Sequence, residues 1–148
     1  MACRYAGAVP DAPSLSAERI KHLEFIQATI ARFGNTSFII KGWAFTVSAA
    51  IFAIQANKLT LGLASTTFVP VFAFWALDGY FLWQERLFRF LYDDVRQPIS
   101  PVESMSMNTA GYRSRTSWWA ATRSATLVLA YGGLTVIDVF LLVTAILK

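Results

Sequence analysis

Three ionisable residues lie inside long apolar stretches of this sequence, and they are the residues best placed to do chemistry: Lys41, Asp78 and Asp138. An ionisable side chain at the centre of a membrane span costs about 2.5–3.5 kcal/mol on insertion scales, so each of them needs a partner or a purpose. In such a setting a carboxylate or an amine can hold a counter-ion, relay a proton or line an aqueous path. These three positions therefore define the chemistry that the chain can offer.

Lys41 and Asp78 are expected at matching depths. Lys41 lies four residues after the start of one apolar stretch at Ser37, and Asp78 lies five residues before the end of the next at Trp83. In two antiparallel helices these positions are about 6 and 7.5 Å from the same membrane surface. We predict an intramembrane ion pair that fixes the register of the two helices. Two alternatives stay open: Lys41 extends to the headgroups while Asp78 binds a hydroxyl or water, or the pair relays a proton or an ion.

Asp138 lies 14 residues into the third apolar stretch, at a depth that neither Lys41 nor Asp78 reaches. It is expected either to be neutral and hydrogen-bonded to a threonine hydroxyl, or to face a water-filled space between several copies. The candidate hydroxyls are those of Thr66, Thr67 and Thr135. Gly132 and Gly133 form a small face on the same stretch, where another helix can approach closely. Asp138, Gly132 and Gly133 are therefore the candidate pore or helix-seam residues.

The elements that carry these residues are predicted to be transmembrane helices. Apolar residues make up 55% of the chain and charged residues 15%, whereas soluble domains have about 25% charged residues. The apolar stretches cover residues 37–56, 59–83 and 124–147. Twenty helical residues reach about 30 Å, the thickness of a hydrocarbon core. The fold class is thus an all-α integral membrane protein with three transmembrane helices.

The remaining segments complete five expected units. Residues 1–15 form a flexible leader that contains the single cysteine, Cys3, and residues 16–36 form an N-terminal amphipathic cytoplasmic helix that ends at a break over residues 34–36. Residues 37–96 form a hairpin whose second helix continues past the membrane to about residue 94, with a kink at Pro70. Residues 97–121 form an irregular cytoplasmic loop, and residues 122–148 contain the third span.

Basic residues are distributed unequally about the spans. Five precede or begin the first span and six lie between the second and the third, whereas only Lys58 and Lys148 lie near the opposite ends. The positive-inside rule places the amino terminus and the central loop in the cytoplasm and the carboxyl terminus in the periplasm, for a multi-pass protein of the inner membrane. The net charge of +4 is explained by this topology and by anionic lipids, so no nucleic-acid partner is expected.

No catalytic centre is expected. His22 is the only histidine and Cys3 the only cysteine, and the sequence contains none of the common nucleotide-binding, hydrolase or metalloprotease motifs. We therefore predict no enzyme activity, no cofactor and no metal site. The candidate contacts for a partner or a signal are basic and aromatic residues after the second span and in the loop: Arg86, Arg89, Tyr92, Arg113 and Arg115.

The stretch from His22 to Arg96 contains a distinctive string. It includes Lys41-Gly42-Trp43, then residues 74–80 (FWALDGY), which continue into residues 84–89 (QERLFR) and 91–93 (LYD). This half of the chain resembles the short two- to four-span proteins encoded in bacterial defence loci. The resemblance implies a membrane-disrupting effector that acts under a cytoplasmic sensor, and it transfers no residue of a nucleotide pocket.

Two functions are compatible with these features. The first is a homo-oligomeric inner-membrane effector or small channel that perturbs membrane integrity or ion balance on a cytoplasmic signal, in phage defence. Three helices enclose little space, so a channel would require self-association. The alternative is a non-conducting membrane anchor or accessory subunit that holds a partner protein through the cytoplasmic helix and loop.

Overall fold

The computed structural model describes residues 15–57 and 60–147, and within those ranges the chain is helical without strands. The long helices are α1 (Ala17–Asn57), α3 (Phe68–Val95) and α5 (Ala125–Ile146). The short ones are α2 (Leu61–Thr66), the 3-10 helix η1 (Ala110–Tyr112) and α4 (Trp118–Thr122). Three segments are long and apolar enough to cross a membrane, Ala17–Gln55, Leu61–Val95 and Ala125–Ile146, as the sequence predicts. The expected leader up to residue 14 with Cys3, and the residues Lys58 and Lys148, lie outside the described ranges.

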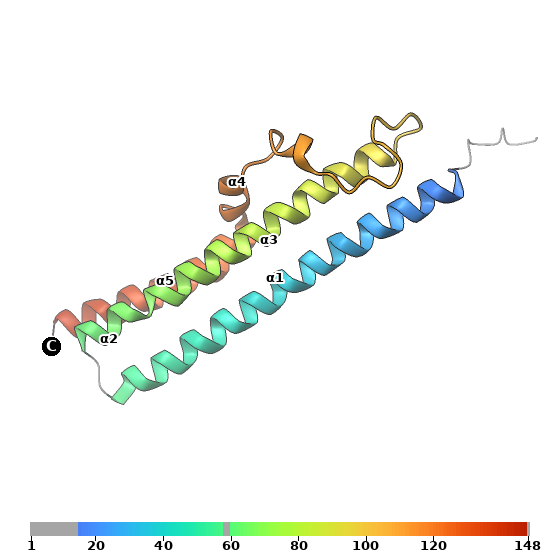
Figure 1. The fold of residues 1–148 in the computed structure, drawn as a ribbon. Helices are drawn as coiled ribbons and strands as arrows, with labels where there is room; N and C mark the ends of the chain where they lie inside the picture. The colour runs from blue at the N-terminus through green and yellow to red at the C-terminus, as the bar shows by residue number, and fades with distance from the viewer. Residues whose placement is uncertain (1–14, 58–59, 148) are drawn as a thin grey trace, which may run out of the picture.

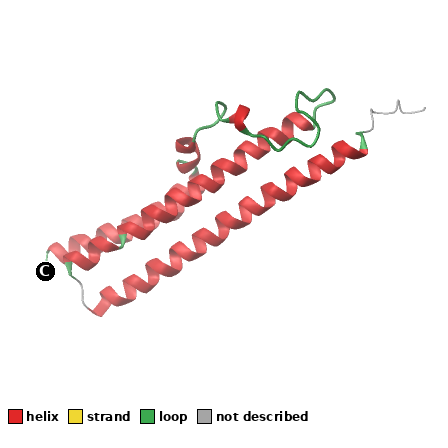
Figure 2. Ribbon diagram, viewed as in Figure 1, coloured by secondary structure: helices red, strands yellow, loops and turns green. Residues whose placement is uncertain are grey.

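The long helices form two regions that share α1 and α3 (Figure 1). α1 and α3 run antiparallel and pack side by side. At one end α5 packs against α2 and α3, and we call this region the bundle: residues 37–57 of α1, α2, residues 68–83 of α3, and α5. At the other end the connection after α3 folds back along it, as the green trace in Figure 2 shows. We call this region the stalk: residues 17–36 of α1, residues 84–95 of α3, and residues 97–117.

α1 is one continuous helix of 41 residues, so the predicted break over residues 34–36 is wrong. A separate amphipathic helix over residues 16–36 is therefore not shown; those residues form the first half of α1. Packing on α3 explains the continuity. The Phe33 ring lies 5.6 Å from that of Phe88 and 6.2 Å from that of Phe81, and a Cβ at Gly34 would lie 3.8 Å from Glu85 Oε2. These contacts outweigh the helix penalty of a single glycine, about 1 kcal/mol.

The second candidate span is interrupted at Thr67, between α2 and α3, three residues before the Pro70 at which the sequence predicts a kink. Pro70 causes the interruption because it has no N–H to donate to the carbonyl of Thr66, four residues earlier. Gln55 of α1 fills the gap: its Nε2 donates to Thr67 Oγ1 at 2.6 Å and to the Leu63 carbonyl at 3.2 Å. A side chain of α1 thus supplies hydrogen bonds at the interruption.

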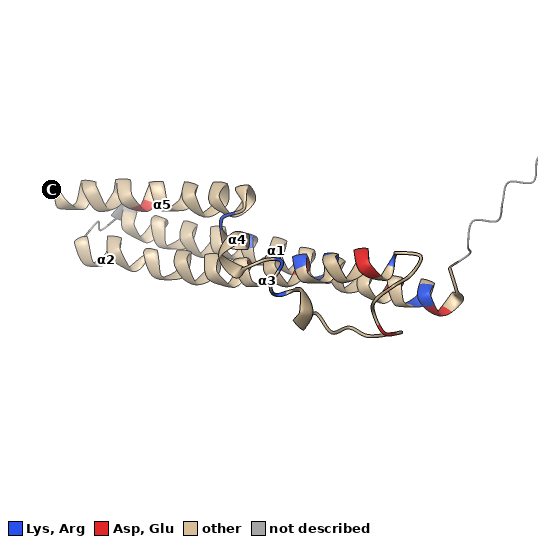
Figure 3. Ribbon diagram, turned by 90° about the horizontal axis from the view of Figure 1, so that it is seen from above, with Lys and Arg blue, Asp and Glu red and all other residues tan. Residues whose placement is uncertain are grey.

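Each region has its own buried core. In the stalk the core contains Ile26, Leu87, Leu91, Val95 and Tyr112, and in the bundle Ala44, Val71, Leu127, Tyr131 and Leu134. Charged residues gather in the stalk half of the molecule, whereas the bundle is nearly uncharged (Figure 3). Large apolar side chains lie exposed on the bundle surface, among them Phe38 at 76% and Leu129 at 77%. Such a surface requires lipid or another apolar covering.

The segment predicted as an irregular loop, residues 97–121, contains only η1 and the start of α4 as helical structure. It is nevertheless packed against the stalk. The Trp83 indole N–H donates to the carbonyl of Thr116 at 3.1 Å, and Tyr112 is only 8% exposed. Regular secondary structure is largely absent from this segment, but tertiary contacts give it a defined path.

Candidate functional site

All three long helices meet at Asp78, whose side chain is completely buried. Lys41 Nζ lies 2.7 Å from Asp78 Oδ2, and the Tyr131 hydroxyl donates to the same oxygen at 3.1 Å. The Ser37 hydroxyl donates to Asp78 Oδ1 and accepts from Lys41 Nζ at 2.8 Å. The structure thus brings Lys41 and Asp78 together as the sequence predicts, and adds Ser37 and Tyr131. We call these four residues the Asp78 junction.

The Asp78 junction is electrically neutral and saturated with hydrogen bonds. One ammonium group balances one carboxylate, and both carboxylate oxygens accept hydrogen bonds. A buried ion pair of this kind contributes little net stability, but leaving either charge without its partner is costly. The junction therefore fixes the relative positions of α1, α3 and α5, and it leaves no acid or base free for catalysis.

Gly79 allows α4 to pack directly against the junction. A Cβ at Gly79 would lie 2.3 Å from Thr122 Cγ2, a distance that no real Cβ contact tolerates. The Trp75 indole N–H donates to the Thr122 carbonyl at 3.3 Å, and Thr122 is completely buried. α4 consequently packs against α3 beside the Asp78 junction.

A second set of buried residues, one from each long helix, lies seven residues farther into the bundle than the Asp78 junction. Ser48 follows Lys41 by seven residues, and Asp138 follows Tyr131 by seven. Seven residues are about two helical turns, so each lies on the same helix face as its predecessor, about 10.5 Å farther along. Val71 precedes Asp78 by the same interval on the antiparallel α3. All three side chains are buried, with 1–2% exposure.

Asp138 has no hydrogen-bond partner within the described part of the chain, although it is only 1% exposed. The predicted bonds to threonine hydroxyls are therefore wrong. Threonine in a helix commonly donates to a carbonyl one turn earlier. Thr135 donates to the Tyr131 carbonyl at 2.8 Å and Thr66 to the Leu63 carbonyl at 2.7 Å. Thr67 accepts from Gln55 and donates weakly to the Ala64 carbonyl.

The three candidate pore or seam residues do not share one surface. Asp138 points into the interior of a single copy, whereas Gly133 is exposed on the other side of α5. No heavy atom outside their own helix lies within 4 Å of a Cβ built at Gly132 or Gly133. Gly132 contributes to a shallow groove of about 200 Å³ beside Phe72 and Trp75 of α3. The two glycines thus leave open space at the surface of the bundle, whereas Asp138 lies in its interior.

The five candidate contact residues mostly hold the stalk together. Arg86 donates to the Ala120 carbonyl at 3.0 Å, and Arg89 pairs with Glu85 at 2.6 Å. Arg113 lies over the Trp83 ring at 5.9 Å. Tyr92 packs against the stalk core.

Arg115 connects the loop with α3. Its guanidinium lies 3.5 Å from Asp94 Oδ1 and 5.0 Å from the centre of the Tyr112 ring. Burial, and next a hydrogen bond with Asp94, raise the pKa of Tyr112 above its ordinary value of 10.0. Arg115 and Tyr112 therefore tie residues 112–115 to the end of α3.

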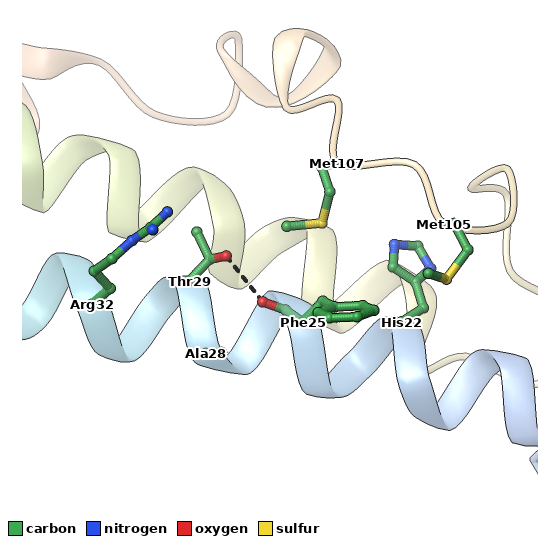
Figure 4. A pocket seen from close by; sticks show the side chains of 7 residues that line it. All are labelled: His22, Phe25, Ala28, Thr29, Arg32, Met105 and Met107. Carbon is green, nitrogen blue, oxygen red and sulfur yellow. Dashed lines mark hydrogen bonds between the residues drawn. The ribbon is translucent and has the colours of Figure 1, made fainter.

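A groove of about 540 Å³ that was not predicted from the sequence lies on the stalk, between α1 and the loop (Figure 4). Its apolar lining consists chiefly of Phe25, Met105 and Met107, which are 53%, 44% and 39% exposed, and Arg32 lies at one end. His22 Nε2 hydrogen-bonds the Ser106 carbonyl at 2.9 Å and so holds the methionine segment on α1. No periodic pattern connects Phe25 with residues 80 positions later, so the sequence carries no signal for this groove.

Within the described residues, no group of three or more histidine, cysteine, aspartate or glutamate side chains is placed to hold a metal ion. No family model, no curated protein and no solved structure matches the chain. The resemblance to proteins of bacterial defence loci stays a prediction, and the case for a function rests on the arrangement of the chain's own residues.

Proposed function

We propose that this protein is a non-conducting membrane anchor or accessory subunit that holds a partner protein through its stalk. The proposed topology follows the distribution of basic residues: the stalk lies in the cytoplasm, the three spans cross the inner membrane, and the carboxyl terminus lies in the periplasm. Lipid then covers the exposed apolar side chains of the bundle.

The observation that carries this proposal is the apolar groove at Phe25, Met105 and Met107, on the half of the molecule that holds most of its charge. Methionine-rich grooves adapt to apolar side chains of a partner helix. The Arg32 guanidinium makes no hydrogen bond or ion pair with the described residues, so it can pair with an acid of the partner. The expected partner segment is an amphipathic helix with apolar anchors and an acidic residue near one end.

The direction of the polar groups in the spans also favours an anchor. Asp78 and Asp138 point into the interior of one copy, and the Lys41 ammonium points to Asp78. The outward faces of α5 are apolar, with Leu129, Val136 and Phe140 at 65–77% exposure. A water-filled path between copies needs polar groups on outward faces, which these residues do not provide.

A photo-crosslinking amino acid at position 25 in native membranes tests the proposal. We expect a crosslink to a cytoplasmic or membrane partner that is lost when Met107→Glu places a charge in the groove. Ile99 is the matched control, because it is 88% exposed on the loop and lies outside the groove: a crosslinker there should not capture the partner, and Ile99→Glu should leave the position-25 crosslink intact. Crosslinks only to lipid, or equal capture from both positions, would refute the anchor.

A homo-oligomeric effector or small channel, acting in phage defence on a cytoplasmic signal, is the second candidate. The continuity of α1 favours it, because a helix that runs unbroken from stalk to bundle transmits a movement of one to the other. Its test is the mass of the protein in nanodiscs together with ion flux from liposomes. A closed oligomer with flux that Asp138→Asn alters would favour the effector, and a silent monomer or dimer the anchor.

A further inference from the structure

Three buried side-chain oxygen atoms have no hydrogen-bond partner in the described chain: Asp138 Oδ1, Asp138 Oδ2 and Gln55 Oε1. All three are acceptors, and each belongs to a side chain that is at most 2% exposed. A buried polar group without a partner destabilises the fold, and an ionised carboxylate without one does so more strongly. The bundle interior therefore lacks a donor or a positive charge at this place.

Other buried polar residues of the bundle also offer oxygen atoms. Ser48 of α1 belongs to the same buried set as Asp138, seven residues beyond Lys41 as Asp138 is beyond Tyr131. Gln55 lies two turns farther along α1, and its amide is bonded to Thr67, about 6 Å beyond Asp138 by helical rise. Ser48, Gln55 and Thr67 are all buried. By helical rise these buried side chains lie within about two turns of Asp138 along the bundle axis.

The single negative charge of the Asp138 carboxylate indicates which kind of ligand would fit. Asp138 is the only ionisable residue of this set, and Lys41, two turns away, is already paired with Asp78. A monovalent cation would neutralise the carboxylate, whereas a divalent one would leave a buried positive charge. Carboxylate, amide and hydroxyl oxygens are the ligands of hard cations. In transporters, sodium ions are bound beside interrupted helices. Here the interruption lies at Thr67, between α2 and α3.

We propose that Asp138 and Ser48, with Gln55 at the interrupted helix, bind a sodium ion in the interior of a single copy. The ion supplies the positive counter-charge that the Asp138 carboxylate lacks, and it fixes α5 to α1. This inference does not depend on the partner or on the proposed function, because it concerns one copy of the isolated protein.

Thermal unfolding of the purified protein in nanodiscs tests the site. The salts to compare are sodium chloride, potassium chloride and choline chloride at equal ionic strength. Because a ligand that binds only the folded state stabilises it by mass action, we expect Tm to rise with sodium concentration in the wild type. Choline should give no such rise, and potassium a smaller one. In Asp138→Asn the dependence on sodium should vanish, and in Ser48→Ala it should shift to higher concentration.

Asp93→Asn is the matched control, since it removes a carboxylate from the stalk and should keep the full sodium dependence. Bound ²²Na⁺ on the wild-type protein, displaced by unlabelled sodium but not by choline, gives a readout that does not require any variant to fold. Equal Tm values in the three salts, with no ²²Na⁺ retained, would overturn the proposal and leave Asp138 as a protonated carboxyl. Sodium dependence that persists in Asp138→Asn would overturn it as well.

Discussion

The Tyr131 hydroxyl donates to the same oxygen of Asp78 that Lys41 Nζ contacts, so one carboxylate oxygen joins α5, α3 and α1. The phenol fixes α5 against a pair of helices whose register the ion pair has already set. Lys41 contributes a positive charge, Asp78 a negative charge and Tyr131 a neutral hydrogen bond, so mutation can separate their contributions to stability.

Lys41→Met should destabilise the fold more than Asp78→Asn. Loss of Lys41 leaves the fully buried Asp78 without a counter-charge, at a cost of about 3–5 kcal/mol. In Asp78→Asn the lysine, which is 22% exposed, can instead extend toward the membrane surface. Tyr131→Phe should cost about 1 kcal/mol, the net value of one hydrogen bond. Reversible unfolding in mixed micelles measures all three, and the reverse order of the first two would contradict the role given to Asp78.

Gly79→Ala should release α4 from the bundle, because the added Cβ would meet Thr122 at 2.3 Å. We expect a loss of about 1–3 kcal/mol, as for other overpacked sites. Gly42→Ala is the control: no atom lies within 4 Å of its Cβ, and a helical alanine is favoured over glycine by about 1 kcal/mol. Hydrogen exchange of residues 118–122 should rise only in Gly79→Ala. Equal exchange in the two variants would show that α4 does not depend on this approach.

Pro70→Ala should join α2 and α3 into one helix. The new N–H can donate to the Thr66 carbonyl, and the clash of the proline ring with that carbonyl disappears. Backbone chemical shifts of residues 64–70 should then become helical throughout. The Gln55 side chain should at the same time lose its bond to the Leu63 carbonyl, which becomes occupied by the helix. An interruption that persists at Thr67 would mean that Gln55, and not Pro70, causes it.

The attachment of residues 110–115 to the stalk should weaken at alkaline pH. The pKa of Tyr112 is raised in the folded protein, chiefly by burial and then by Asp94. The unfolded segment thus loses its proton at lower pH than the folded one. The stabilisation is complete below about pH 10 and is lost as pH rises through the folded pKa. Exchange rates at these residues should increase over that window in the wild type, and the increase should be smaller in Tyr112→Phe, which cannot ionise.

Features that follow from the apolar composition, and from the positions of charged residues within the apolar stretches, were predictable from the sequence. Long apolar stretches predict helices that can span a membrane, and opposite charges at equal depth predict that Lys41 meets Asp78. Ser37 could have been added, because it precedes Lys41 by one turn on the same helix face. Tyr131 could not, because its contact depends on how α5 is rotated about its own axis, and an apolar helix gives no amphipathic pattern from which to infer that rotation.

Features that depend on tertiary contact were not predictable. Gly34 and its neighbours indicate a break when considered alone, yet the aromatic contacts of Phe33 with α3 keep the helix intact. The loop lacks periodicity, but single contacts such as that of Trp83 with Thr116 define its path. The stalk groove combines Phe25 with methionines far along the chain, and only the folded loop brings them together.

The order of the charges along the chain has a consequence for how the protein enters the membrane during synthesis. Lys41 and Asp78 belong to consecutive spans, so the two can leave the insertion machinery as a hairpin whose charges are already neutralised. Asp138 emerges later, in a span that carries no basic residue of its own. We therefore expect a fragment truncated before α5 to insert normally, whereas a fragment that begins at α2 carries Asp78 without its lysine and should insert poorly.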